Sequence, residues 1–276
     1  MGKALDGQVA IITGGARGQG QADAVALARL GARVVLCDVP APMTSVQYEL
    51  GTAADLALTV SLVKEAGSEA IAVAADVRDP AAVARVAGAA LAKFGQIDIL
   101  VANAGIVSTG RVWELSDEAW QEMIGTNLTG VFNAMRAVVP HMRERRYGRI
   151  VAISSQGGRT GLPGISHYSA AKWGVIGLAK SLALEVAAEG ITVNVVAPTT
   201  VRTPMVVNER TVERSSDGAP LSDGMLAKRF AAHHPIPRPW VYPEDVAREV
   251  VHLVTEPGNI TGAVIEIGLG QSARMH

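Results

Sequence analysis

Residues 9–20 read VAIITGGARGQG, an apolar run followed at once by a glycine-rich turn. The run has the length of one strand, and the Ala- and Leu-rich stretch at 19–30 has the pattern of a helix. Glycines let a backbone approach a pyrophosphate closely, and a helix N-terminus presents unpaired N–H groups and the positive end of its dipole. Strand, turn and helix together therefore predict a dinucleotide-binding site.

The same alternation of short β-branched runs and longer helical stretches continues along the chain. Runs such as Val34-Val35-Leu36 are apolar throughout, as in a parallel sheet covered by helices on both faces. The pattern predicts one α/β domain over residues 1–276, a Rossmann-type doubly wound fold with a seven-stranded parallel sheet. The expected strands are Val9–Thr13, Arg33–Asp38, Ala70–Ala75, Ile97–Ala102, Arg149–Ser154, Thr192–Ala197 and Ala263–Ile267. The expected helices lie near 19–30, 52–66, 80–94, 117–144, 165–189 and 243–256.

Two segments break this alternation. Residues 39–51, which we call the insertion, separate a strand from its helix, where about 2–6 residues are usual. Its Pro40 and Pro42 restrict its first residues, and its apolar side chains predict a lid over the adenosine half of the cofactor. Residues 199–242, which we call the substrate loop region, contain prolines that interrupt their helical stretches. We expect this region, with loops 106–113 and 156–165, to shape the substrate pocket.

Composition excludes several classes of function. Hydrophobic residues make up 49% and charged residues 18%, which is a globular balance. A net charge of −1 offers no basic field for nucleic acid or an anionic membrane surface. No apolar run is long enough to span a membrane, and no secretory signal is recognisable. The single cysteine, Cys37, excludes an internal disulfide and a cysteine-based zinc site. We expect a cytoplasmic protein with no metal.

The second expected strand ends in Asp38, which bears on the choice of dinucleotide. A carboxylate at this position can accept both hydroxyls of the adenosine ribose and would repel a 2′-phosphate. Arg17 could pair with such a phosphate, but Val39 follows Asp38, so no second cation completes the site. The sequence favours NAD over NADP.

Acid and base chemistry is predicted around Tyr168 and Lys172, which share one face of an expected helix. A free tyrosine titrates near pH ~10, too high for efficient proton exchange at neutral pH. An ammonium group about 4 Å away would lower the pKa of the phenol. We therefore expect Tyr168 to act as general acid and base, and Ser155 to polarise the substrate oxygen. Ser154 is the alternative serine, but the spacing to Tyr168 favours Ser155.

Several motifs, in their order along the chain, resemble those of the short-chain dehydrogenase/reductase family over nearly its whole length. They are Gly14-x3-Gly18-x-Gly20, Asn103-Ala104-Gly105, Asn127, Ser155 and Tyr168-x3-Lys172. The resemblance implies that Asn127 holds a proton-relay water near Lys172, that Asp76-Val77 clamps the adenine, and that residues 198–205 bind the nicotinamide amide. Thr199 stands where the family has glycine. The implied catalytic residues are Asn127, Ser155, Tyr168 and Lys172. The implied cofactor contacts are Gly14, Arg17, Gly18, Gln19, Gly20, Asp38, Val39, Asp76, Val77, Asn103, Ala104, Gly105, Tyr168, Lys172, Val201 and Thr203.

Three further features resemble the mycofactocin-coupled, carveol dehydrogenase-like branch of that family. They are the insertion, Thr199, and the run Pro239-Trp240-Val241-x-Pro243-Glu244-Asp245. The resemblance implies that a secondary alcohol, such as a terpenoid, is oxidised to its ketone with tightly held NAD. It also implies that an external redox carrier re-oxidises the cofactor and that the protein is a homotetramer.

Two other functions stay open from the sequence. One is a carbonyl reductase that works in the opposite direction with freely exchanging NAD(P)H. The other is a catalytically silent dinucleotide sensor. The set of Asn127, Ser155, Tyr168 and Lys172 favours an enzyme, because a sensor needs no acid and base groups.

Overall fold

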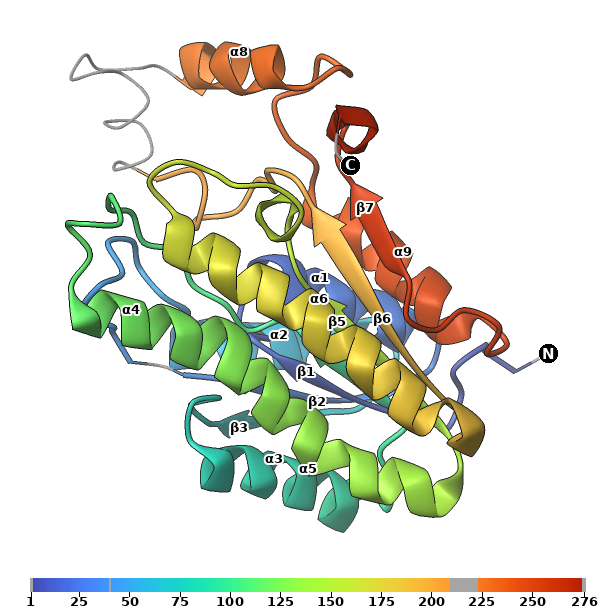
Figure 1. Cartoon of the computed structure of the whole chain (residues 1–276). Coiled ribbons are helices and arrows are strands. Elements are labelled where there is room, and N and C mark those ends of the chain that lie inside the picture. Colours follow the sequence, from blue (N-terminus) through green and yellow to red (C-terminus); the bar gives the residue numbers. More distant parts are fainter. Residues whose placement is uncertain (1, 40, 209–222, 275–276) are drawn as a thin grey trace.

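The computed structural model describes residues 2–39, 41–208 and 223–274, and the strands in that part form a single parallel sheet (Figure 1). The sheet has seven strands in the order β3-β2-β1-β4-β5-β6-β7. The predicted doubly wound sheet is therefore confirmed. Its strands are β1 (Val9–Thr13), β2 (Arg33–Asp38), β3 (Ala70–Ala74), β4 (Ile99–Ala102), β5 (Gly148–Ile153), β6 (Ile191–Pro198) and β7 (Val264–Ile267).

Helices cover both faces of the sheet. Among the described elements, α3, α5 and α6 pack on one face, and α1, α2 and α9 pack on the other. Helix α8 lies apart from the sheet at the top of Figure 1. The helices are α1 (Gly18–Arg29), α2 (Ala53–Glu65), α3 (Pro80–Phe94), α4 (Asp117–Ile124), α5 (Gly130–Arg145), α6 (Ser166–Val186), α8 (Asp223–His233) and α9 (Pro243–Thr255).

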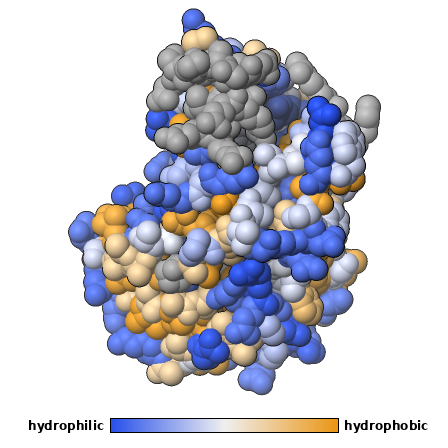
Figure 2. Space-filling model, turned by 90° about the vertical axis from the view of Figure 1, so that its left-hand side faces the viewer, coloured by the Kyte–Doolittle hydropathy of each residue, from blue (hydrophilic) through white to orange (hydrophobic). Residues whose placement is uncertain are grey.

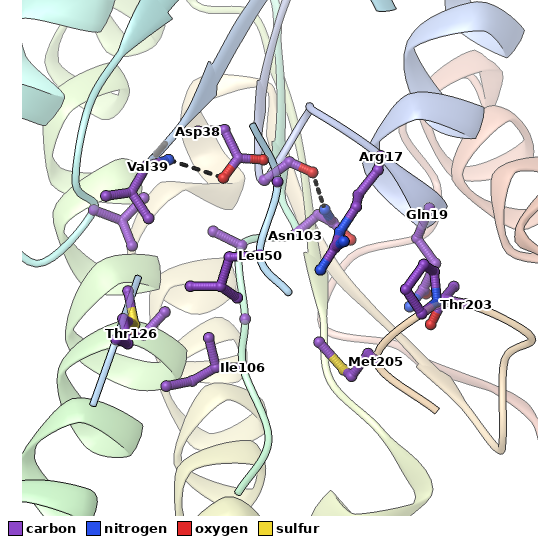
Figure 3. A pocket seen from close by; sticks show the side chains of 18 of the residues that line it. Arg17, Gln19, Asp38, Val39, Leu50, Asn103, Ile106, Thr126, Thr203 and Met205 are labelled. Carbon is purple, nitrogen blue, oxygen red and sulfur yellow. Dashed lines mark hydrogen bonds between the residues drawn. The ribbon is translucent and has the colours of Figure 1, made fainter. Parts of the chain in front are cut away.

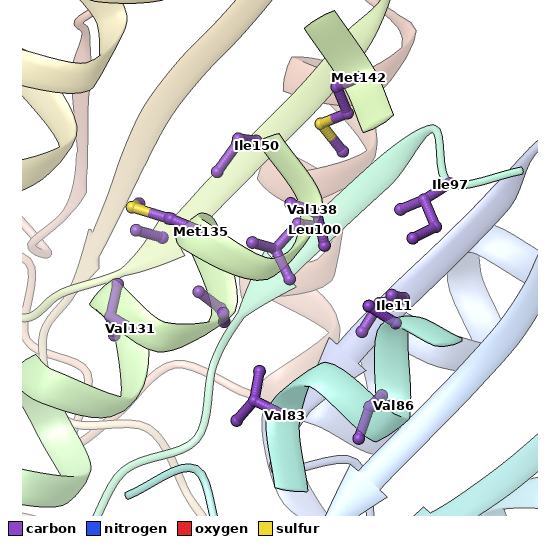
Figure 4. Close-up of a cluster of buried hydrophobic side chains, with 14 of the residues drawn as sticks. Ile11, Val83, Val86, Ile97, Leu100, Val131, Met135, Val138, Met142 and Ile150 are labelled. Carbon is purple, nitrogen blue, oxygen red and sulfur yellow. The ribbon is translucent and has the colours of Figure 1, made fainter. Parts of the chain in front are cut away.

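Alternating side chains of the strands feed two separate apolar layers. Val9 and Ile11 of β1 pack toward α3, α5 and α6, while Ala10 and Ile12 pack toward α1 and α9. Figure 4 shows the first layer, in which Val83 and Val86 of α3 and Val138 of α5 surround β1 and β4. Because both faces are buried, the strands need apolar residues at every position, which is the pattern seen in the sequence.

The direction in which successive parallel strands are added to the sheet reverses at β1, which pairs with β2 on one side and β4 on the other. Strands 1 to 3 run outward in one direction and strands 4 to 7 in the other. The loops that leave the carboxyl ends of β1 and β4 therefore diverge and open a crevice, which is where such sheets bind ligands. The glycine turn after β1 and residues 103–105 after β4 border this crevice.

Two elements differ from the prediction. The expected continuous helix 117–144 is interrupted by a π-helical turn, Gly125–Thr129, between α4 and α5. The substrate loop region was predicted without a regular helix, yet residues 223–233 form α8. Pro40 of the insertion and residues 209–222 of the substrate loop region, Pro220 included, lie outside the described residues.

Candidate active site

An open cleft of about 830 Å³ lies at the switch point of the sheet. Figure 3 shows Arg17, Gln19 and Thr203 along one side of it and Val39 and Thr126 along the other. Many of the predicted cofactor residues line the cleft, while several of its other wall residues come from the insertion. The predicted residues in its lining are Gly14, Arg17, Gly18, Gln19, Asp38, Val39, Val77, Asn103, Ala104, Gly105 and Thr203.

Backbone groups dominate the glycine turn at one end of the cleft. Gly14 has a φ of +68°, and a Cβ there would lie 2.8 Å from the Cα of Ala104. A Cβ on Gly20 would lie only 2.2 Å from the carbonyl oxygen of Gly14. The N-cap of α1, Arg17, makes no side-chain capping bond. The first turn of α1 therefore keeps unpaired N–H groups directed at the cleft, which suits a phosphate.

Asp38 is held firmly at the end of β2. Its carboxylate accepts hydrogen bonds from the backbone N–H of Ala16 (2.9 Å) and of Val39 (2.8 Å). Burial raises the pKa of Asp38, while these two hydrogen bonds and the nearby Arg17 oppose that rise. The Arg17 guanidinium donates to the carbonyl oxygen of Glu49 in the insertion. Arg17 is thus already paired, and Asp38 keeps free acceptor sites toward the cleft.

Asn103 joins the two loops that border the cleft. Its amide donates to the carbonyl oxygens of Thr13 (3.0 Å) and Gly14 (3.1 Å). In return, the Thr13 hydroxyl accepts from the backbone N–H groups of Asn103 and Ala104, both at 3.0 Å. The position of residues 103–105 is therefore fixed relative to the glycine turn.

The two residues of the predicted adenine clamp, Asp76 and Val77, are placed differently in the structure. Val77 lines the cleft, but the carboxylate of Asp76 does not belong to its lining. Instead Asp76 accepts the guanidinium of Arg78, with Nη2 at 2.6 Å and Nε at 2.9 Å. The role of Asp76 toward adenine stays a prediction.

The insertion links β2 to α2 in the sequence, and its described residues contact both the cleft and α4. Met43, Tyr48 and Leu50 line the cleft, and Met43 packs with Ile106 and Met123. Glu122 of α4 accepts hydrogen bonds from the backbone N–H groups of Thr44 (3.2 Å) and Ser45 (2.9 Å) and from the Ser45 hydroxyl. Burial opposes the effect, but these bonds hold the pKa of Glu122 below its usual value. Figure 2, which looks onto this side of the molecule, shows apolar side chains gathered over its lower part.

The structure separates the two candidate serines. The Ser154 hydroxyl is buried and donates to the carbonyl oxygen of Lys172 at 2.9 Å. Ser155 is partly exposed, accepts a hydrogen bond from the backbone N–H of Gly157 (3.0 Å), and also hydrogen-bonds Tyr168. Only Ser155 of the pair therefore lies beside the phenol.

The expectation that Lys172 lowers the pKa of Tyr168 is wrong for this structure. Burial raises the pKa of Tyr168, and the Ser155 hydrogen bond only partly opposes it. The Lys172 ammonium lies 5.7 Å from the centroid of the Tyr168 ring and donates a hydrogen bond to the carbonyl oxygen of Ile153 at 2.8 Å. Burial also lowers the pKa of Lys172 to about 8. Both shifts reflect the cost of charging a group away from water.

Asn127 lies in the π-helical turn and is fully buried. Its side chain binds the backbone of Ile106 at both ends, accepting from N–H and donating to C=O at 2.8 Å each. A Cβ on Gly105 would lie 3.3 Å from the Asn127 oxygen and 3.5 Å from the Lys172 ammonium. Asn127 and Lys172 are thus brought to the same point, but the Asn127 carboxamide is already committed to the backbone.

The segment after β6 shows why Thr199 can replace a glycine. Its hydroxyl donates to Gln271 (2.8 Å) and lies 3.0 Å from Nε2 of His234. Thr199 therefore ties this segment to the C-terminal region and to the end of α8. Val201, a predicted cofactor contact, is buried in the core, whereas Thr203 lines the cleft.

Sequence reasoning missed several residues that shape this site. Thr13 fixes the loop after β4, yet it has no signal beyond its place before the glycine turn. Glu122 anchors the insertion from a helix far away in sequence, which no local spacing could reveal. Ser108 and His167 form a buried hydrogen bond of 2.8 Å next to Tyr168, although neither lines the cleft.

The model of the short chain dehydrogenase family matches residues 8–214. With a parallel doubly wound sheet and this arrangement of glycine turn, tyrosine and lysine, the chain belongs to the short chain dehydrogenase family. The resemblance found in the sequence is therefore confirmed.

Individual relatives are similar over almost the full chain. The (−)-trans-carveol dehydrogenase of Rhodococcus erythropolis is 42% identical over 276 residues, which cover 98% of this chain and 99% of the relative. Among solved structures, a carveol dehydrogenase from Mycobacterium avium in complex with NAD has a TM-score of 0.95 at 36% identity, covering 98% and 99% of the two chains. A short chain dehydrogenase from Mycobacterium paratuberculosis bound to NAD has a TM-score of 0.88 at 32% identity, with the same coverage. The resemblance to the carveol dehydrogenase-like branch is thereby confirmed.

Residues 2–39, 41–208 and 223–274 lack two kinds of feature. In this part of the chain no helix has the length and apolar character needed to cross a membrane. The same residues contain no cluster of three His, Cys, Asp or Glu side chains that could hold a metal ion.

Proposed function

We propose that this chain catalyses the oxidation of a secondary alcohol to its ketone with NAD as hydride acceptor. One observation carries the proposal: Ser155, Tyr168 and Lys172 lie together next to Gly105 and Ile106, two residues of the cleft that also contains the glycine turn and Asp38, although none of the three is itself in the lining of that cleft. The carveol dehydrogenase names of the relatives support an alcohol of terpenoid type.

NAD fits the residues that are present, and when bound it supplies the hydride acceptor. Asp38 would bind the adenosine ribose, and the unpaired N–H groups of α1 would bind the pyrophosphate. Arg17 uses one N–H group of its guanidinium on the carbonyl oxygen of Glu49 and keeps others, so it does not decide between the two cofactors. The Asp38 carboxylate, which would repel a 2′-phosphate, supports NAD over NADP.

The side chains at the other end would handle the proton. The Ser155 hydroxyl would donate to the substrate oxygen, and Tyr168 as phenolate would accept the proton of the alcohol as the carbonyl forms. Lys172 would stabilise the phenolate by its charge and bind the nicotinamide ribose. Because the Asn127 side chain is bound to Ile106, we assign it the positioning of residues 105–107, and any relay water must bind backbone groups there.

An alcohol panel with the protein as purified tests the proposal. Reduction of added NAD is followed in one arm and reduction of an artificial electron acceptor in the other. Turnover of secondary alcohols in either arm supports the proposal. Ketone reduction alone would favour the carbonyl reductase. No turnover with any alcohol or ketone, but tight NAD binding, would favour the dinucleotide sensor.

We further propose that the insertion is a lid that retains NAD, so that an external redox carrier re-oxidises it in place. The hydrogen bonds of Thr44 and Ser45 to Glu122 close the insertion across the mouth of the cleft. Retention predicts that purified protein carries NAD(H) through gel filtration and that replacing 39–51 by a short turn releases it. Wild-type protein that exchanges NAD within milliseconds would overturn the lid and, with it, the external carrier.

We also propose that the protein is a homotetramer. Helices α4, α5 and α6 form the outer layer of one face (Figure 1), and large apolar side chains on them are exposed. Strand β7 is an edge of the sheet and supplies a second surface. Sedimentation should give a tetramer, and Trp173→Glu, on the exposed side of α6, should dissociate it. The exposed side chains are Trp120, Phe132, Trp173 and Leu184.

A further inference from the structure

Three consecutive residues after β4, 106–108, are each held by a side chain from a different element. Asn127 binds the backbone of the first. The Tyr48 hydroxyl accepts from the N–H of the second at 3.1 Å. His167 Nε2 lies 2.8 Å from the hydroxyl of the third, Ser108. The segment that runs past the reacting groups is therefore fixed from three sides.

His167 is the member of this set that belongs to the first turn of α6. It immediately precedes Tyr168 and is fully buried. Helix α6 begins at Ser166, and its N-cap residue Ile165 makes no side-chain hydrogen bond. Tyr168 thus lies in an uncapped first turn, where backbone N–H groups lack helical partners and where helices fray most readily.

The hydrogen bond between Ser108 and His167 joins loop 106–113, one of the loops predicted to shape the substrate pocket, to the first turn of α6, which directly follows the predicted loop 156–165. Beside it, the N–H of Gly110 donates to the carbonyl oxygen of Gly164 at 2.9 Å, and Gly110 forms a bridge with Ile165. Burial lowers the pKa of His167, so the ring is neutral near pH 7 and the bond joins two neutral groups. Because both partners are buried, losing one leaves the other without a partner.

We propose that His167, held by Ser108, is a positioning residue that fixes Tyr168 at the distance from Ser155 that proton transfer requires. The proposal rests on the proposed function for the role of Tyr168. We assign His167 no step in the chemistry itself. Its hydrogen bond to Ser108 ties the uncapped first turn of α6 to residues 106–108.

Three single variants and one double variant test this role, and a fourth single variant serves as the control. His167→Asn and Ser108→Ala should each lower kcat by about 10- to 100-fold, the size expected when a reacting group moves by roughly 1 Å, with little change in KM for NAD. His167→Gln should recover much of kcat, because its amide nitrogen lies as many bonds from the backbone as Nε2, whereas that of Asn does not. The double variant Ser108→Ala with His167→Asn should be no worse than either single variant.

Ser169→Ala is the matched control. Ser169 flanks Tyr168 on the other side and is also buried, but its hydroxyl has no hydrogen-bond partner among the residues that the structure describes. We expect wild-type kcat for this variant. Full kcat in His167→Asn and Ser108→Ala, equal loss in His167→Gln and His167→Asn, or additive losses in the double variant would each overturn the proposal.

Amide hydrogen exchange of residues 166–170 gives a readout that needs no substrate. Exchange should be faster in Ser108→Ala and His167→Asn and unchanged in Ser169→Ala. If wild-type protein oxidises no alcohol, the proposed function fails, and the exchange data still decide whether the pair fixes this turn. Unchanged exchange in both variants would overturn the positioning role even if the enzyme is active.

Discussion

The two ends of the cleft are formed by different kinds of chemical group. At the cofactor end, the groups that face the cleft are largely backbone: the glycine turn, the open N-terminus of α1 and the loop that Asn103 fixes. At the other end, next to the lining residues Gly105 and Ile106, the groups are side chains from the π-helical turn, the end of β5 and α6, namely Asn127, Ser155, Tyr168 and Lys172. The first end depends on local spacing, whereas the second depends on how distant helices pack. Substitutions at the two ends should therefore fail in different ways.

The largest effect should come from Tyr168→Phe. The change removes one oxygen from the side-chain end and leaves the glycine turn untouched, so kcat should fall by about 10²- to 10⁴-fold while NAD binding and melting temperature stay the same. Steady-state kinetics and NAD titration measure both. Tyr242→Phe is the control, since Tyr242 is exposed. A Tyr168→Phe enzyme that keeps a large part of its turnover would show that the phenol is not the acid and base.

For Gly20→Ala we expect a loss of NAD affinity, in contrast to the loss of kcat in Tyr168→Phe. A Cβ there would lie 2.2 Å from the Gly14 oxygen, so the turn must move and NAD affinity should drop by roughly 100-fold, as for a 1 Å misplacement of a binding group. Calorimetric titration with NAD measures the loss. Gly88→Ala in α3 is the control, because nothing lies within 4 Å of its Cβ and the helix should gain up to about 1 kcal/mol. Unchanged NAD affinity in Gly20→Ala would mean that the turn does not bind the cofactor.

Asp38 is the side chain at the cofactor end that we expect to choose between NAD and NADP. Asp38→Ala should weaken NAD by about tenfold and strengthen NADP, because a carboxylate beside a 2′-phosphate is a like-charge contact. Titration of both cofactors into wild type and variant checks the ratio. Tighter NADP binding by the wild type would show that Arg17, despite its bond to Glu49, outweighs Asp38.

The sequence predicted the backbone-built end well. Strand, glycine turn, helix and Asp38 are consecutive or share one βαβ unit, so spacing alone places them, and the structure keeps Gly14, Asp38 and Asn103 around one cleft. The side-chain end was predicted as a set of residues but not as a geometry. Three features arise from packing between elements far apart in sequence. They are the π-helical turn at Asn127, the hydrogen bond from the Ser154 hydroxyl to the Lys172 carbonyl oxygen, and the 5.7 Å between the Lys172 ammonium and the centroid of the Tyr168 ring.

The pH dependence of turnover examines that geometry. Burial raises the pKa of Tyr168 and lowers that of Lys172 to about 8, so the pair should lose one proton near pH 8. Removing that proton permits the phenolate and ammonium form, and alcohol oxidation should therefore rise as the pH increases through about 8. Ketone reduction, which needs the protonated pair, should fall over the same range. In Lys172→Met, the rise in oxidation should move to higher pH. An unchanged profile in that variant would separate Lys172 from the proton transfer.

The smallest effect concerns Asp23, a fully buried carboxylate on α1 whose two oxygens have no hydrogen-bond partner within residues 2–39, 41–208 and 223–274. Burial raises its pKa well above the usual value, so the folded state holds this proton more tightly than the unfolded state does. Stability from this group is therefore greatest below the unfolded pKa and is lost as the pH rises toward the folded one, by at most about 1.4 kcal/mol per pH unit. Asp23→Asn should remove that loss, so urea unfolding at pH 5 and pH 8 should show its advantage over wild type growing with pH. Asp6→Asn, at an exposed position, should follow the wild type at both pH values. An advantage of Asp23→Asn that is the same at both would mean that Asp23 finds a partner when α1 binds its ligand or packs in solution.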